Sequence, residues 1–384
     1  MLSNLSISID DLCKINPKIS VVLKREKLSE LKKLIIKNYK SITKFSATMR
    51  YCRSSLGTFL RGKNNPTFLT FKKIAEKLDL RPEEFILKIV IKDNPHGTFI
   101  PIEVFPIKES EVLASLIGHT FGDGHIGKSS FTFTNKSQEL IESVMQKVRQ
   151  LSAKKITINE RFHKAKTIGF PRLVRDILVA AGAPVGNKIV QSFEIPRWIK
   201  NGSLGIKRSF LQALFDDEST VSPKSREIVL NMKKIEKLIN NLHYFFDELK
   251  NLLKDIGVEG ITITTCHRYE GKNGITLEKR LRICGTSNFV AFQNKIGFLS
   301  NKKAEKLKTL IEGTQRFQLR SGEAKEKIMH ILQKDGKFTT KEIAKKIRIS
   351  SWSAWDYLQE LEKKNLVERI RTSNTSHIWH LKRS

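Results

Sequence analysis

The stretch LASLIGHTFGDGHIG, residues 113–127, and the stretch FLQALFDDESTV, residues 210–221, decide the fold. Each is an apolar run at helical spacing that ends in acidic residues. In the first stretch Gly118 and Gly122 are four residues apart, so they share one face of a helix. Two residues without side chains on that face allow a second helix to approach closely. We therefore predict that the two stretches form packed helices, with Ala213 as the small residue on the second.

The same succession of signals follows each of these stretches. After Asp123 come SSFTFTN, a helical run, KITINERF, KTIGF and a short helix closing on GAPVGNK. After Glu218 come REIVLNM, a helical run, GITITTCHR, LRICG and a short helix closing on GFLSNKK. Lys188 and Lys303 end the two series, each six residues beyond a glycine. This parallel order predicts an internal duplication.

The two stretches also carry a family resemblance. Residues 116–124 match the nine-position pattern of the LAGLIDADG homing endonucleases at its small and acidic positions, and residues 211–219 fall on the same positions. The segment IPRWIK, which precedes the second stretch, resembles a sequence pattern common in that family. Residues 108–200 and 201–312 thus resemble the two repeats of a single-chain enzyme. The resemblance implies an α+β fold in which two pseudo-symmetric αββαββα-type repeats form a DNA-binding saddle.

The resemblance also implies a catalytic site. In the family each motif helix delivers one carboxylate to the adjacent scissile phosphates, which makes Asp123 and Glu218 the expected catalytic pair and the ligands of Mg²⁺ (or Mn²⁺). Hydrolysis of a phosphodiester requires positive charge beside both the attacking and the leaving oxygen, and carboxylates can hold Mg²⁺ there. Lys188 and Lys303 match the basic residues that flank such sites and could stabilise charge on the phosphate. A generic basic patch is the alternative for these lysines.

Two positions depart from the family pattern. Ser219 replaces the glycine that normally follows the second acid, which would strain a helix exit that needs a positive φ. Asp217 stands where a small interface residue is expected, and a carboxylate buried there is costly unless it is paired. His119 and His125 lie near the site, and we assign neither of them a role.

Polar and apolar residues alternate in three predicted strands. Phe131 and Phe133 face one way in SSFTFTN, and Leu281 and Ile283 do the same in RLRIC. The opposite faces then carry side chains suited to phosphates and base edges. These predicted DNA contacts are Ser130, Thr132, Thr134, Thr157, Asn159, Arg161, Arg280 and Arg282. Plain solvent exposure is the alternative for such rows.

Helical segments precede the duplicated region. Residues 28–92 contain four short runs with apolar residues at helical spacing, and residues 54–85 resemble the phage-repressor type of helix-turn-helix. The resemblance places a recognition helix at about residues 53–60, with Arg53, Arg61 and Lys63 as DNA contacts. A helical bundle without a DNA role is the alternative. Residues 1–27 give no firm periodic signal, and residues 93–107, rich in proline, predict a linker.

The segment 320–384 predicts a second DNA-binding unit. A helix, a short helix, a turn and a longer helix are followed by VERIRTSNTSHIWHL, whose alternation is typical of a two-stranded wing. This order resembles a winged helix, with residues 350–364 as the recognition helix. Winged helices also serve as protein-protein modules, which is the alternative here.

Composition points to a polyanionic partner. Lys and Arg number 70 against 39 Asp and Glu, which gives a formal charge of +31. Nucleic acid is the usual partner of so basic a soluble chain, and a hydrophobic content of 39% excludes a disordered basic arm. The four cysteines form no C-x-x-C pair, so they predict neither a zinc site nor a disulfide framework. Apolar runs are too short to span a membrane, and no secretory signal begins the chain.

These patterns favour a site-specific endonuclease that makes a Mg²⁺-dependent double-strand cut in DNA. We expect a cytoplasmic protein, nucleoid-associated in a prokaryote, that works on double-stranded DNA as a monomer because both repeats lie in one chain. The alternative is a transcription regulator whose LAGLIDADG saddle binds DNA without cutting. An intein with a nested endonuclease is disfavoured, because no splicing nucleophile begins the sequence and no His-Asn pair ends it.

Overall fold

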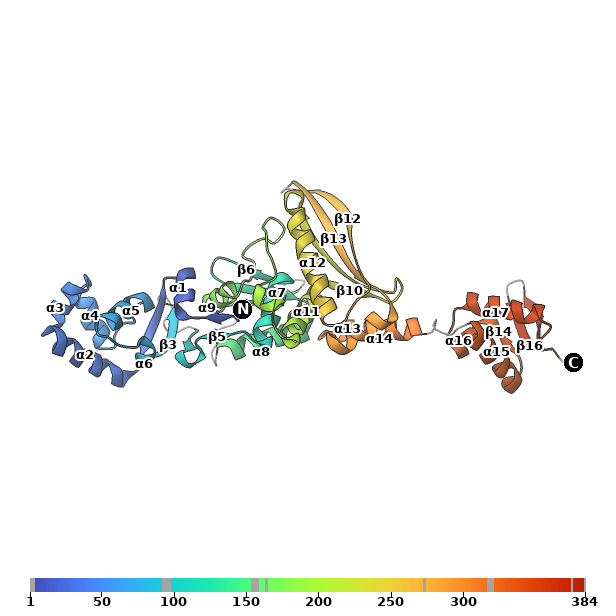
Figure 1. Ribbon diagram of the computed structural model, residues 1–384, viewed down its shortest axis with the longest axis horizontal. Helices are drawn as coiled ribbons and strands as arrows, with labels where there is room; N and C mark the ends of the chain where they lie inside the picture. Colours follow the sequence, from blue (N-terminus) through green and yellow to red (C-terminus); the bar gives the residue numbers. More distant parts are fainter. Residues whose placement is uncertain are drawn as a thin grey trace.

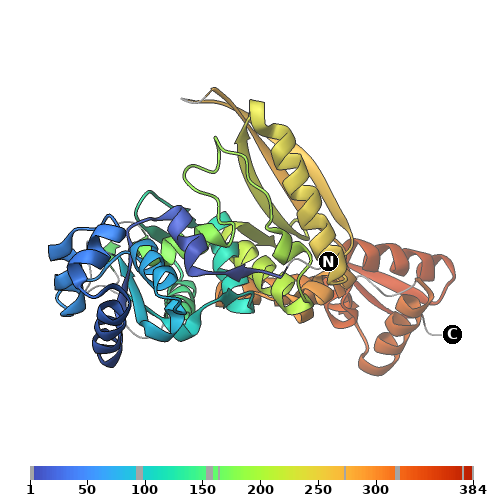
Figure 2. The same ribbon diagram turned by 60° about the vertical axis from the view of Figure 1, so that its left-hand side comes forward.

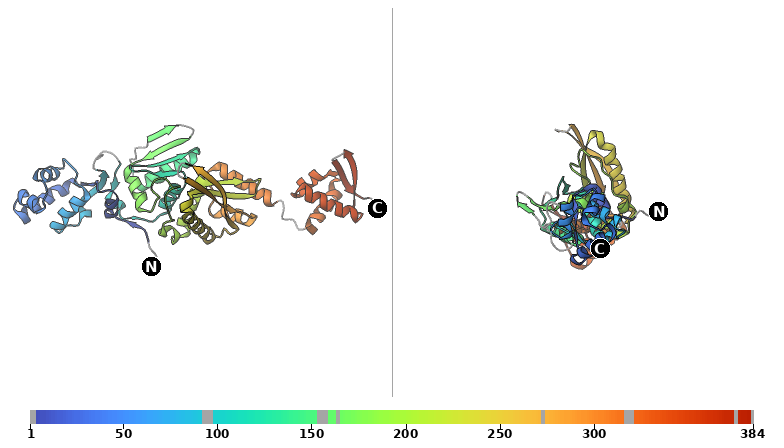
Figure 3. Two further views of the ribbon diagram at one scale, coloured as in Figure 1. Left: turned by 90° about the horizontal axis from the view of Figure 1, so that it is seen from above. Right: turned by 90° about the vertical axis from the view of Figure 1, so that its left-hand side faces the viewer.

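The protein is a mixed α/β chain with two four-stranded sheets of the same topology at its centre (Figure 1). The computed structural model describes residues 4–91, 98–152, 159–162, 165–271, 274–315, 321–373 and 376–382. Seen from above in Figure 3, the N-terminal elements, the two sheets and the C-terminal elements follow one another along the long axis. None of the described helices is long and apolar enough to span a membrane.

The first repeat has the element order αββαββα. Its elements are α7 (Glu111–Phe121), β6 (Gly124–Ile126), β7 (Phe131–Asn135), α8 (Gln138–Ser152), β8 (Asn159–Phe162), β9 (Lys166–Phe170) and α9 (Arg172–Ala180). The antiparallel strands lie in the order β6-β7-β9-β8. Phe131 and Phe133 are fully buried under this sheet, as the alternation in the sequence predicts.

The second repeat has the same order and confirms the duplication. A short helix, α10 (Arg197–Lys200), leads into α11 (Leu204–Glu218), β10 (Ser219–Ser222), β11 (Glu227–Ile235), α12 (Ile239–Asp255), β12 (Ile261–Gly271), β13 (Gly274–Ile283) and α13 (Thr286–Lys295). Its strands lie in the order β10-β11-β13-β12, the counterpart of the first sheet. The helix α12 lies along one face of this sheet, and α14 (Asn301–Gln315) follows the repeat (Figures 1 and 2).

The helices α7 and α11 pack directly on each other at the centre of the molecule. A β-carbon placed on Gly118 would lie 2.5 Å from the carbonyl oxygen of Phe210 and 2.8 Å from Cβ of Ala213. One placed on Gly122 would lie 2.4 Å from Cβ of Asp217. The structure thus places Gly118, Gly122 and Ala213 where the two helices come closest, and only glycine fits the first two positions.

The N-terminal part contains the four expected helices together with a small sheet. Its elements are β1 (Ser6–Ile7), α1 (Ile9–Ile15), β2 (Ile19–Leu23), α2 (Arg25–Tyr39), α3 (Ile42–Thr48), α4 (Arg53–Leu60), α5 (Phe68–Lys77), α6 (Pro82–Phe85), β3 (Ile86–Ile91), β4 (Ile100–Pro101), the 3₁₀ turn η1 (Ile102–Val104) and β5 (Ile107–Lys108). Strands β2, β3 and β4 form one sheet. Pro101 is accommodated because β4 is an edge strand.

Two segments are more ordered than the sequence suggests. The first 27 residues, which show no firm periodic signal, include α1, which begins with a capping box formed by Ser8 and Asp11. The expected linker at residues 93–107 includes β4 and the turn η1, because Ile100 and Ile102 are buried in the core. Neither segment is long enough to show a period of its own, so its structure depends on partners elsewhere in the chain.

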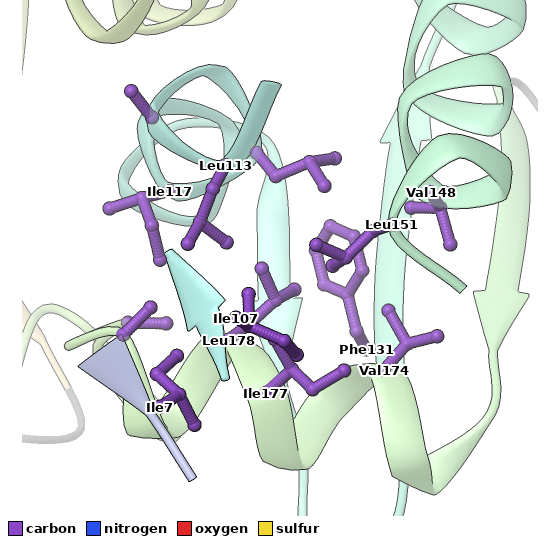
Figure 4. Packing of buried hydrophobic residues seen from close by; sticks show 14 of the residues in the cluster. Ile7, Ile107, Leu113, Ile117, Phe131, Val148, Leu151, Val174, Ile177 and Leu178 are labelled. Carbon is purple, nitrogen blue, oxygen red and sulfur yellow. The ribbon is translucent and has the colours of Figure 1, made fainter. Parts of the chain in front are cut away.

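One hydrophobic core joins the N-terminal part to the first repeat. Figure 4 shows Ile7 of β1 beside Ile107, with Ile117 of α7 and Ile177 of α9 packed around them. Strand β1 pairs with β5, and α1 packs against α9. At that contact the side-chain amide of Asn16 donates a 2.8 Å hydrogen bond to Asp176, and both residues are fully buried.

The C-terminal part has a core of its own and confirms the predicted winged helix. Its elements are α15 (Ser321–Asp335), β14 (Phe338–Thr339), α16 (Thr340–Ile347), α17 (Ser351–Lys363), β15 (Val367–Ser373) and β16 (Ser376–Leu381). The buried Trp379 is the largest side chain of this core. The helix α17 corresponds to the expected recognition helix, and β14 adds a third strand beside the two-stranded wing.

Candidate functional site

The ends of α7 and α11 open onto a cleft of about 530 Å³. Asp123 and Glu218 both line it, together with Lys188, Asn231 and Lys233. The packing of the two motif helices brings the acids together from separate repeats. The backbone N–H of Asp123 also donates a 3.2 Å hydrogen bond to the carboxylate of Asp217 near the end of α11.

Negative charge converges on this cleft. Asp123 accepts a 2.7 Å hydrogen bond from the side-chain amide of Asn135, which orients its carboxylate. Partial removal from water, followed by the charges of Asp217 and Glu218, raises the pKa of Asp123 to about 7. Burial also raises the pKa of Glu218, against the opposing effect of Lys188. The neighbouring carboxylates thus oppose the ionisation of Asp123, and a cation in the cleft would relieve this repulsion.

Lys188 and Lys303 occupy equivalent places beneath the two acids. The ammonium of Lys188 donates hydrogen bonds to three carbonyl oxygens around the end of α7. These are the oxygens of Thr120 at 3.2 Å, of Gly124 at 3.0 Å, and of Gly122. Lys303 donates to the carbonyl oxygens of residues 215 and 216 at the end of α11, at 3.0 and 2.6 Å. Burial lowers the pKa of both lysines. Each lysine therefore caps the negative end of its own repeat's motif helix.

The buried carboxylate of Asp217 has a partner across the helix interface. Its Oδ2 lies 2.9 Å from Nδ1 of His119, and both side chains are inaccessible to solvent. Asp217 thereby avoids the full cost of an isolated buried charge. Its Oδ1 and the Nε2 of His119 are buried without a hydrogen-bond partner among the residues that the structure describes. His119, for which the sequence predicts no role, is thus part of the interface between the two motif helices.

Ser219 does not strain the end of α11. Its φ of −94° is extended, and its hydroxyl donates a 2.6 Å hydrogen bond to the carbonyl oxygen of Phe215. At the equivalent position Gly124 has no room for a side chain, because a β-carbon there would lie 2.6 Å from the carbonyl oxygen of His119. The glycine of the family pattern is therefore required by close packing in the first repeat only.

The residues present fit the divalent cation that the family resemblance implies. Asp123 and Glu218 supply carboxylate oxygens from two separate elements, and such oxygens with water are what Mg²⁺ prefers. The nearest lysines, Lys188 and Lys303, donate to backbone carbonyls instead of to these carboxylates. Asn135 leaves one carboxylate oxygen of Asp123 for a cation.

Most of the DNA contacts predicted for the duplicated region lie on strands of the two sheets. Thr132 and Thr134 lie on β7 opposite its buried phenylalanines, with Ser130 just before the strand. The hydroxyl of Thr134 shares a 2.8 Å hydrogen bond with that of Thr167. Asn159 and Arg161 lie on β8. Thr157 lies outside the described residues.

The arginines of β13 already have partners. Arg280 donates a 3.1 Å hydrogen bond to Asn231, and Arg282 pairs with Glu227. Both arginines stay half-exposed, whereas Leu281 and Ile283 between and beside them are fully buried. These pairs hold the guanidinium groups in place across the sheet, on the face away from the core.

In the N-terminal part, Arg53 begins α4, and Arg61 and Lys63 follow its end. All three are exposed. Their positions at the two ends of one short helix are compatible with phosphate contacts on either side of a groove.

Several residues around the cleft carry no signal in the motifs. Asn135 orients Asp123, and Asn231 and Lys233 line the cleft from β11. Buried Lys234 donates a 2.7 Å hydrogen bond to the carbonyl oxygen of Lys188, so the second sheet holds the loop of the first repeat. The alternation in EIVLNMKKI was a usable signal for Asn231 and Lys233. Nothing in the sequence indicates the partner of Lys234.

Fold and site together define a two-repeat protein with a LAGLIDADG-like fold. Residues 205–297 match the family model described as a LAGLIDADG-like domain. Residues 323–368 match the model described as winged helix-turn-helix DNA-binding.

Curated relatives share about half of this chain. The tRNA-splicing ligase RtcB of Methanopyrus kandleri is 25% identical over an alignment of 222 residues that covers 51% of this chain and 22% of that protein. The replication factor C small subunit of Methanocaldococcus jannaschii is 25% identical over an alignment of 217 residues that covers 51% of this chain and 11% of that protein. The chain thus spans about a fifth or less of the length of these relatives, and their activities as whole proteins do not transfer to it.

Two solved structures are weakly similar. Full-length DUF199/WhiA from Thermatoga maritima has a TM-score of 0.35 and 14% identity, covering 66% of this chain and 90% of that one. I-DmoI in complex with DNA and Mn has a TM-score of 0.33 and 15% identity, covering 49% of this chain and 96% of that one. At these values neither similarity carries information about activity.

Proposed function

We propose that the protein is a site-specific DNA endonuclease of the LAGLIDADG type that makes a divalent-metal-dependent double-strand cut. The observation that carries the proposal is the meeting of Asp123 and Glu218, one from each repeat, in a single cleft. A duplicated site with one acid from each half suits a substrate with two antiparallel strands. Both halves lie in one chain, so a monomer has a complete site.

The chain's own residues hold and orient the groups that this chemistry requires. Asp123 and Glu218 would bind Mg²⁺ or Mn²⁺, which supplies positive charge to the attacking and leaving oxygens of the phosphodiester. Asn135 fixes the carboxylate of Asp123. Lys188 and Lys303 hold the ends of α7 and α11, so that each acid leaves its helix at a fixed place. Their ammonium groups also add positive charge near the phosphate.

Double-stranded DNA is the proposed partner. A formal charge of +31 favours binding to a polyanion, with release of its counterions. The strands around the cleft present the half-exposed Arg280 and Arg282 on the face away from the core. The winged helix at residues 323–368 adds a second surface of a kind that binds DNA.

A regulator that binds DNA without cutting is the second candidate. The winged helix favours it, because this unit contacts DNA without needing the chemistry of the cleft. The buried Asp217 also favours it, since a third carboxylate beside the acids departs from the family pattern. Both candidate functions involve binding of double-stranded DNA, and they differ in whether the protein cuts the DNA backbone.

One experiment separates the two candidates. The purified chain is incubated with a random-sequence double-stranded DNA library and Mg²⁺, or Mn²⁺ in a parallel reaction, and both bound DNA and new ends are sequenced. The endonuclease yields new ends at one enriched sequence, and they disappear when EDTA is added. Enrichment of a bound sequence without new ends under either metal would establish the regulator instead.

The C-terminal part provides a further prediction. Because residues 321–382 form a core separate from that of the rest, we expect deletion of residues 320–384 to leave the remaining fold intact. DNA binding should weaken about tenfold or more, as expected when one of two linked binding units is lost. Cleavage at saturating protein should persist. Gel-shift titration and a cleavage time course measure the two effects, and lost cleavage at unchanged affinity would show that this part completes the active site.

A further inference from the structure

The hairpin of β12 and β13 contains a β-bulge at Cys266. The pairing register shifts between Thr265 and His267, which leaves Cys266 as an extra residue opposite Glu278. Neighbouring residues of a regular strand face opposite sides of a sheet, whereas a bulge can bring both to the same side. The thiol of Cys266 accordingly lies 3.5 Å from a carboxylate oxygen of Glu278, and His267 pairs with the same glutamate across the strands.

The bulge gathers three side chains that can bind a metal ion. The sulfur of Cys266, a ring nitrogen of His267 and a carboxylate oxygen of Glu278 all lie within 4.8 Å of one another. Glu278 is buried, Cys266 is half-buried and His267 is exposed. The buried Glu278 is therefore held in place, and the exposed side at His267 is open to an ion and a water ligand.

This cluster lies on the face of the sheet away from α12. The next residue on β13, Lys279, points to the opposite face, where its ammonium meets the ring of His243 on α12. Glu278 instead accepts a 3.0 Å hydrogen bond from the hydroxyl of Tyr269 and forms a 3.2 Å ion pair with Lys233. Lys233 also lines the cleft of Asp123 and Glu218, so the cluster and the cleft share one open face of the second repeat.

We propose that Cys266, His267 and Glu278 form a binding site for one zinc-class divalent cation. A thiolate and an imidazole are ligands that Zn²⁺ accepts readily and Mg²⁺ does not, so this site differs in chemistry from the two acids of the cleft. Three protein ligands and a water complete the tetrahedral shell of Zn²⁺. On binding, the thiol releases its proton to solvent and the cation replaces Lys233 as the partner of Glu278. The freed ammonium of Lys233 then becomes available to a phosphate on the same face.

Cobalt titration of the full, EDTA-treated chain tests this site. Co²⁺ is a spectroscopic substitute for Zn²⁺, and we expect thiolate-to-cobalt charge-transfer absorption that saturates at one ion per chain. Zn²⁺ should displace the cobalt, while an excess of Mg²⁺ should not. Cys266→Ser should abolish the charge-transfer absorption, and Glu278→Gln should weaken Zn²⁺ binding at least about tenfold.

Cys52→Ser is the matched control. Cys52 is exposed, and hydrogen bonds from Ser54 and Ser55 lower the pKa of its thiol to about 7, so it is the strongest competitor for adventitious metal. The control should retain the full absorption and stoichiometry. Zn²⁺ should also raise the melting temperature of the unchanged chain and of Cys52→Ser but not that of Cys266→Ser. The proposal is overturned by absorption that survives Cys266→Ser, by absorption lost in Cys52→Ser, or by its absence from the unchanged chain.

Discussion

Asp123→Asn and Glu218→Gln are each expected to reduce double-strand cleavage by a factor on the order of 10²–10³ or more, while DNA binding is retained. An amide keeps the shape of the carboxylate but removes the negative charge that holds the cation. Binding measured without divalent metal should stay equal or tighten, because a negative charge facing phosphate is gone. Conversion of supercoiled plasmid carrying the target to linear and nicked forms measures cleavage, and a gel shift measures binding.

Asp255→Asn is the control for this pair. Asp255 is a surface acid that pairs with Lys207 at the far end of α12, outside the cleft. Its removal changes the net charge by the same amount as Asp123→Asn and should leave the cleavage rate unchanged. Undiminished cleavage by both cleft variants would exclude the assignment of the two acids.

Gly118→Ala is expected to lower the free energy of unfolding by about 3 kcal/mol. The added methyl group would meet the carbonyl oxygen of Phe210 and Cβ of Ala213 at 2.5 and 2.8 Å, and one of these contacts is to backbone that cannot rotate away. The helices α7 and α11 would have to separate, which also displaces the two acids. Urea denaturation followed by circular dichroism measures the loss of stability.

Gly313→Ala provides the comparison within another helix. Gly313 lies in α14, and apart from its chain neighbours and the adjacent backbone of α14 no atom of the described residues comes within 4 Å of a β-carbon placed there. Alanine should therefore be neutral or stabilise the chain by about 0.5–1 kcal/mol, in keeping with its higher helix propensity. Equal effects of the two substitutions would mean that the contact between α7 and α11 does not depend on Gly118.

The features that the sequence predicts are those with a local signal. The two repeats could be found because the same succession of periodic segments occurs twice. The two motif helices also end in acids at equivalent positions. The four N-terminal helices could be found because each is long enough to show its period. Strands β1 and β2 could not, since β1 has two residues and β2 pairs with β3, about 70 positions away along the chain.

The candidate site was predicted in part for the same reason. The acids follow from the motif, whereas the pairing of Asp217 with His119 depends on how α7 and α11 cross, which sequence spacing does not specify. The role of Lys188 and Lys303 as caps depends on the direction of two loops. The equal spacing along the sequence between each lysine and a glycine did indicate that the two lysines are equivalent. Gly182 and Gly297 both have a positive φ, which turns the chain after α9 and α13.

Under the proposed function, the core shared by the N-terminal part and the first repeat would set a fixed distance between two DNA-contacting surfaces. Because β1, α1 and α9 fix α4 relative to the saddle, a duplex that touches both must present its two contact sites at one separation and one rotational phase. Five inserted base pairs, about half a helical turn, would turn one contact site to the opposite side of the duplex. The winged helix has a core of its own, so its covalent connection would raise its local concentration near the duplex without setting this distance.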